Sequence, residues 1–125
     1  MNIKTLSAAI KKGGFTYSLS LGNLANEPFW AVGLNKNTEK VFDSPPTTAD
    51  IEAYILSNRG ELFSASYDRV LGGWEHKGKY YLDVSVVIRK DNPLNTLEGV
   101  LTYAKANDQI AIFDLESMTE IIVEP

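Results

Sequence analysis

Hydrophobic residues recur along the chain at two spacings, one typical of helices and one typical of strands. Apolar positions three and four residues apart predict a helix over residues 3–12. The segment FTYSLSL at 15–21 alternates large apolar residues with serine and threonine, and this period of two predicts a strand. A second strand is predicted for FWAVGL at 29–34, and EKVF at 39–42 is expected to return beside it as a short partner.

Two further helices are predicted from their start signals. Thr47 followed by Asp50 is a capping box, and the helix that it opens is expected to end at Gly60. Asn92 is a suitable N-cap, because Pro93 at the first helical position loses nothing by lacking an N–H group. The buried stripe of this last helix is expected to consist of Leu94, Leu97, Leu101 and Ala104.

The remaining strands are predicted in two pairs. Residues 70–75 and 79–89 flank HKGK, which predicts a hairpin whose turn places Gly78 at positive φ. Residues 109–115 and 119–125 form the second pair. Hairpins separated by helices favour a single α+β domain over residues 1–125, with a mostly antiparallel sheet of about five to seven strands and three helices packed on one face.

The strand at 79–89 predicts a sheet with two different faces. Its side chains alternate, so Leu82 and Val84 lie on one side while Asp83 and Ser85 lie on the other. The glycines before Trp74 allow a bend, a bulge or a close approach of another ring or backbone. A face that is part aromatic and part acidic needs a cover, which is a loop, a second copy of the chain or a ligand. The candidate binding residues are Trp74, Asp83, Tyr81, Ser85, Trp30 and Asp114.

Composition narrows the possible functions. The chain has 125 residues and no cysteine, which excludes disulfides, thiolate metal sites and cysteine nucleophiles. A net charge of −4 without a basic stripe disfavours direct nucleic-acid binding. The N-terminal segment has neither the apolar run of a signal peptide nor that of a membrane span, so a cytoplasmic location without membrane association is expected.

Candidate catalytic groups are few. Ser85, His76 and Asp83 cannot be read as a triad, because no nucleophile elbow surrounds the serine and two of the three project from one strand. Asp83 and Asp114 could share a proton or bind a hard cation if their strands are neighbours. No phosphate-binding or dinucleotide motif is present, and no cofactor or metal is predicted.

Three segments together resemble a group of short uncharacterised proteins carried by bacteriophages and mobile elements. These segments are GGFTYS at 13–18, GGWEHKGKYYLDVSVVI at 72–88 and LTYAKANDQIAIFDL at 101–115. The chain departs from that group at Trp30, where its members carry a small residue or tyrosine. The resemblance implies a phage or mobile-element protein that acts in a bacterial cytoplasm, and it carries over no catalytic residue.

The sequence therefore favours a non-enzymatic accessory protein that binds another macromolecule, such as a host-takeover or anti-defence factor with an unidentified protein partner. The alternative is a small-molecule or nucleotide-binding protein that stacks a ring on Trp74 or Trp30 and uses Asp83 as an acceptor. A carboxylate- or metal-dependent hydrolase built on Asp83 and Asp114 comes third. A homodimer is compatible with each of these functions.

Overall fold

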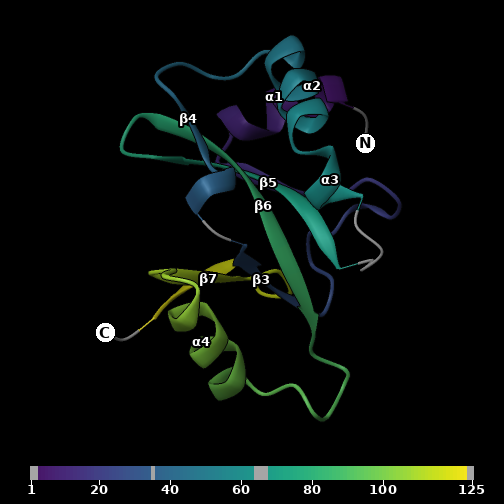
Figure 1. Cartoon of the computed structure of the whole chain (residues 1–125), viewed down its shortest axis with the longest axis vertical. Helices are drawn as coiled ribbons and strands as arrows, with labels where there is room; N and C mark the ends of the chain where they lie inside the picture. Colours follow the sequence, from purple (N-terminus) through teal and green to yellow (C-terminus); the bar gives the residue numbers. More distant parts are fainter. Residues whose placement is uncertain (1–2, 35, 64–67, 124–125) are drawn as a thin grey trace.

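The computed structural model describes residues 3–34, 36–63 and 68–123, and it confirms the predicted α+β class (Figure 1). The elements in chain order are α1 (Ile3–Lys11), β1 (Gly14–Ser18), β2 (Gly22–Asn23), β3 (Phe29–Gly33), the 3-10 turn η1 (Lys36–Thr38), β4 (Lys40–Phe42), α2 (Thr48–Ser57), α3 (Arg59–Leu62), β5 (Arg69–His76), β6 (Lys79–Arg89), α4 (Leu97–Ala106), β7 (Ala111–Asp114) and β8 (Thr119–Ile122). No helix in the described part of the chain is long and apolar enough to cross a membrane.

The described strands form one antiparallel sheet in the order β2-β1-β5-β6-β3-β7-β8, with β4 also paired to β6. The expected pairing of residues 39–42 with the strand at 29–34 is wrong. The long strand β6 instead pairs with β4 through Tyr80, Tyr81 and Leu82, and with β3 through its C-terminal half. Both short strands thus share one edge of β6, because that strand is long enough to hold them end to end.

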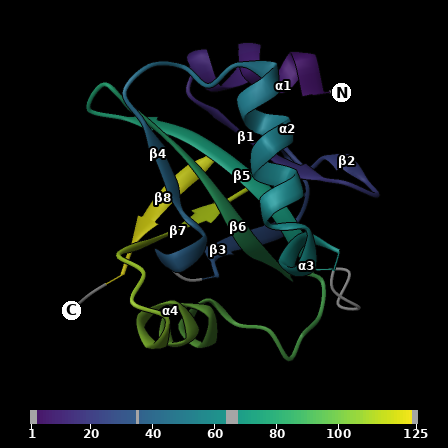
Figure 2. The ribbon, with the colours of Figure 1, turned by 45° about the horizontal axis from the view of Figure 1, so that its top comes forward.

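The helices cover one face of this sheet in two groups. Leu82 and Val84 of β6 pack into a core with α1 and α2, whereas Trp30 and Val32 of β3 pack with α4. Trp30 pairs with Ile88, so the two cores lie on the same side of the sheet. Figure 2 shows α2 over β5 and α4 at the opposite end, beyond β3. The sheet therefore carries helices on one face and leaves its other face to side chains and loops.

The hairpin between β5 and β6 has the predicted turn. Lys77 and Gly78 both have positive φ, at 52° and 79°. Two such residues give a type I′ turn, whose twist matches that of the flanking strands. The turn fixes the register of both strands and so determines which side chains share a face.

The helix boundaries differ from the prediction in two places. The capping box at Thr47 is present, but α2 ends at Ser57, so that Gly60 falls inside the short helix α3. The last helix begins at Leu97 rather than Pro93, and Thr96 is its N-cap. The side chain of Asn92 accepts a hydrogen bond from the Leu94 amide at 3.0 Å, which forms a local turn in place of a helix start.

This shift changes the buried face of α4. Leu94 is 88% exposed and Leu97 is 42% exposed, whereas Val100 and Ala104 are buried against β3 and β7. The predicted stripe is therefore wrong at Leu94 and Leu97, whereas Leu101 is partly buried against the same core and Ala104 is fully buried in it.

Candidate functional site

The face of the sheet away from the helices curls around a pocket of about 500 Å³. Its walls come from both ends of the strand order, from β1 on one side and from β7 and β8 on the other. The space exists because small side chains occupy many of the inward positions around it. The small residues lining it are Gly14, Thr16, Ala31, Gly33, Gly72, Ser85 and Ala111.

One end of this concave face is filled by the protein itself. A separate hydrophobic cluster packs there, made of Leu24, Ala31, Val70, Val87 and Leu115, with Phe29 and Phe113 against it. The loop after β2 closes this end, since the Asn26 amide donates a hydrogen bond to the Leu115 carbonyl at 2.8 Å. The face that was predicted to need a cover is therefore covered in part by this loop and by the curl of the sheet. The uncovered remainder of the face is the pocket.

Trp74 and Tyr81 form an aromatic wall of the pocket. They are paired across β5 and β6, and their rings stack with centroids 4.1 Å apart and planes at 11°. His76 lies at a ring distance of 5.9 Å from Trp74 in a tilted orientation. The stack stiffens both aromatic side chains and presents them from the strand end nearest the hairpin turn.

Asp83 provides the carboxylate of the pocket. It pairs with Gly72, which in turn pairs with Thr16 on β1. A Cβ atom at position 72 would collide with the Asp83 carboxylate, so glycine is what lets this side chain lie across the neighbouring strand. The Ser85 hydroxyl donates a hydrogen bond to Asp83 Oδ1 at 3.0 Å.

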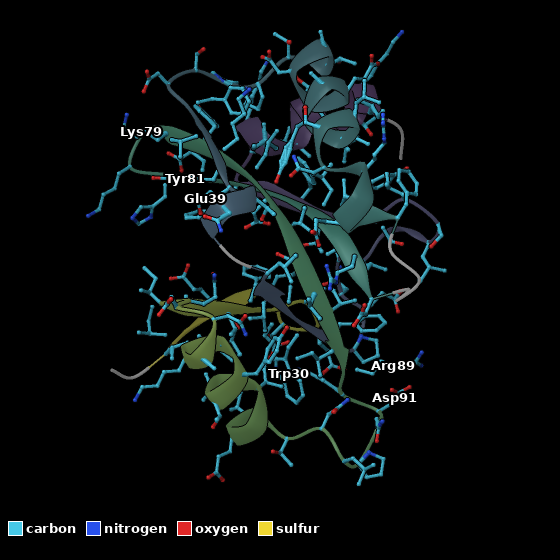
Figure 3. The ribbon with its side chains drawn as sticks, in the orientation of Figure 1. Trp30, Glu39, Lys79, Tyr81, Arg89 and Asp91 are labelled. Atoms are coloured by element: carbon cyan, nitrogen blue, oxygen red, sulfur yellow. The ribbon has the colours of Figure 1, made fainter. Side chains whose placement is uncertain are left out.

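The environment of Asp83 disfavours its charged form. Burial raises the pKa of Asp83 above the ordinary range, and the charge of Glu39 raises it further, against the opposing effect of hydrogen bonds from Ser85 and Trp74. Glu39 comes close because β4 pairs Lys40 with Leu82, which places the preceding residue beside Asp83. Figure 3 shows Glu39 and Tyr81 at the same end of β6. A carboxylate held in this state is a common feature of binding and catalytic sites.

The structure does not bring Trp30 and Asp114 into this pocket. Trp30 is 9% exposed and lies in the core under α4, on the opposite face of the sheet (Figure 3). Asp114 pairs with Trp30 in the ladder between β3 and β7, so it also faces away from Asp83. The strands of Asp83 and Asp114 are separated by β3, so the condition under which the two carboxylates could share a proton or a cation is not met.

Asp114 has a structural role. Its carboxylate contacts the Lys90 ammonium at 2.7 Å, and the same ammonium lies 5.3 Å from the centre of the Trp30 ring. Burial alone would raise the pKa of Asp114, but hydrogen bonds from Lys90 and from the amides of Ser117 and Glu116, together with the Lys90 charge, hold it below the usual value. This ion pair fastens the end of β7 to the segment that follows β6.

Replacing Lys90 by methionine is expected to lower the free energy of unfolding by about 1–3 kcal/mol, because it leaves a largely buried carboxylate without its charged donor. Urea denaturation at neutral pH measures this loss. The control is Arg89→Met, which breaks the exposed pair of Arg89 and Asp91 and should cost less than about 1 kcal/mol. Equal effects of the two substitutions would contradict this role of Lys90.

Sequence reasoning missed Glu39 and the small residues that make the space. The sequence pattern predicts pairing of residues 39–42 with the strand at 29–34, whereas the pairing of β4 with β6 is what brings Glu39 beside Asp83. The small residues Gly33 and Ala111 carry no chemical signal of their own, although an alternation of small inward and large outward side chains along a strand could have indicated a hollow.

Comparison of the chain with protein-family models, with curated proteins and with solved structures gives no match. Within the described residues, no three or more His, Asp or Glu side chains are grouped so that they could hold a metal ion.

Proposed function

We propose that this protein binds a flat small molecule in the concave pocket. The observation that carries the proposal is a space of about 500 Å³ with an aromatic wall of Trp74 and Tyr81 and the carboxylate of Asp83 on its floor. Pockets for small ligands typically enclose about 300–1,000 Å³, with mostly apolar walls and a few polar groups that set the orientation. The pocket falls within this range of volumes, with aromatic rings on its wall and a carboxylate that can orient a ligand.

The shape of the face favours a small molecule over a macromolecule. The sequence suggested an open sheet face as a docking surface, but this face curls inward and is filled at one end by Phe29, Phe113 and their neighbours. A partner protein would therefore meet the rim of the curl, whereas the aromatic pair and Asp83 would be reached by a ligand that enters it.

The geometry gives little support to hydrolysis. Asp83 and Asp114 lie on opposite faces, so they cannot share a proton or a cation. His76 pairs with Lys79 at the hairpin turn, whereas Ser85 pairs with Val70 toward the other end of the same ladder. Neither the two aspartates nor the separated His76 and Ser85 supply an activated nucleophile.

Binding can be measured with a panel of flat bicyclic compounds that includes neutral, cationic and anionic members. In the ¹⁵N-labelled protein we expect saturable shifts at the Gly33 and Gly72 amides and at the Trp74 indole, because these groups line the pocket. Trp74→Ala is expected to weaken binding by about 1–3 kcal/mol, the usual cost of losing one stacked ring.

The matched control is Tyr103→Ala, which removes a partly exposed aromatic ring of α4 outside the pocket and should leave affinity unchanged. A panel in which no compound shifts the pocket amides at millimolar concentration would overturn the proposal.

A further inference from the structure

The ionisable side chains that line the pocket are of one sign apart from a single histidine. They are Glu39, Asp83, Asp108, Glu120 and His76. None of the lining residues in the described chain is lysine or arginine. A phosphate or carboxylate ligand would enter this space without a cation to meet it, so anionic ligands, nucleotides included, are disfavoured.

Asp83 differs from Asp114, a carboxylate on β7, in having no cationic partner. Lys90 neutralises Asp114 at 2.7 Å, whereas no Lys, Arg or His of the described chain forms an ion pair with Asp83. Its protein partners are the donors of Ser85 and Trp74, and the like charge of Glu39 also acts on it. A carboxylate set in a pocket in this way gains most from a positive charge that arrives with a ligand.

The aromatic wall is suited to the same kind of ligand. The paired Trp74 and Tyr81 lie two positions from the Asp83–Gly72 pair, on its hairpin side, and the faces of such rings attract cations as well as flat apolar groups. The overall charge of −4 also favours the approach of a cation.

We propose that the ligand of the pocket is a flat organic cation, whose protonated nitrogen lies between Asp83 and Glu39 while its ring system lies against Trp74 and Tyr81. This inference rests on the proposed function, which it deepens by naming the ligand class. It would exclude nucleotides and other phosphate-bearing signals as occupants.

Three compounds with one ring system and different charges test the inference. They are 4-aminoquinoline as the cation, quinoline as the neutral form and quinoline-4-carboxylate as the anion, each titrated calorimetrically at pH 7.5. The cation is expected to bind about 10- to 100-fold more tightly than quinoline, the difference that a charge-assisted hydrogen bond provides. The anion is expected to bind more weakly than quinoline.

Asp83→Asn is expected to bring the affinities of the cation and of quinoline within about threefold of each other by removing most of the difference that the charge provides. Glu52→Gln, which removes an exposed carboxylate on α2, should leave the wild-type ratio in place. Equal binding of the cation and quinoline to the wild type, or tightest binding of the anion, would overturn the inference and leave the proposed function standing. Absence of pocket binding by all three compounds and by the wider panel would overturn both.

Discussion

Replacing Gly14 by alanine is expected to lower the free energy of unfolding by about 2–5 kcal/mol, which is a large part of the stability of a small domain. Gly14 has a φ of +154°, a backbone conformation that residues with a Cβ atom rarely adopt. The added methyl group would also collide with the carbonyl oxygen of Gly73 and contact Trp74 Cα at 3.1 Å. Both are backbone atoms of the paired strand and cannot move without opening the ladder.

Gly60→Ala is the matched control, because Gly60 lies in α3 with no atom near the position of the added Cβ. It should leave stability unchanged or raise it by up to about 1 kcal/mol through helix propensity. Chemical denaturation of both variants measures the contrast. Similar denaturation midpoints for the two variants would show that β1 and β5 can separate locally at little cost. This result would contradict the explanation that a Cβ atom at position 14 disrupts their pairing.

The close approach that explains Gly14 also explains Gly72 and Gly73. Phe15 pairs with Gly73, and a Cβ atom at position 73 would enter the Phe15 ring on the helix side. Gly72 gives the same freedom to Asp83 on the pocket side. A close approach was one of the alternatives predicted for Gly72 and Gly73. Phe15 became clear as the partner of Gly73 only from the register between β1 and β5, whereas the hairpin register places Asp83 beside Gly72.

Features that depend on neighbouring residues could be predicted from the sequence. The hairpin of β5 and β6 has a turn that fixes its register, and alternation then places Trp74, Tyr81, Asp83 and Ser85 on one face. All four come from this single hairpin and lie together at the pocket. The local signals therefore located the part of the site that one hairpin builds.

Features that depend on distant pairings could not be predicted. Trp30 alternates along β3 as expected, yet which of its faces meets the helices depends on the register with β6. The position of Asp114 depends on β3 lying between β6 and β7. The curl that turns an exposed face into a pocket arises from the whole sheet, so no local sequence pattern predicts it.

Replacing Asp83 by asparagine is expected to raise the free energy of unfolding at neutral pH by about 0.5–2 kcal/mol while it removes the preference for cationic ligands. Burial and the charge of Glu39 raise the pKa of Asp83 in the folded protein, so the charged side chain costs stability there. Asparagine is similar in shape and can still accept the hydrogen bond of Ser85 without carrying a charge.

The pH dependence distinguishes this explanation from a general gain in packing. Between the ordinary aspartate pKa and the raised folded-state pKa, the folded wild-type protein holds a proton that the unfolded chain releases, so wild-type stability falls as pH increases. The advantage of Asp83→Asn should therefore be small at acidic pH and grow to its full value above the folded-state pKa. Urea denaturation of both proteins across this range measures the difference, with Glu52→Gln expected to change stability by less than about 0.5 kcal/mol. A variant that is less stable than the wild type at neutral pH would mean that Asp83 is held for the sake of the fold, whereas greater stability combined with lost cation binding is the pattern of a residue kept for its ligand.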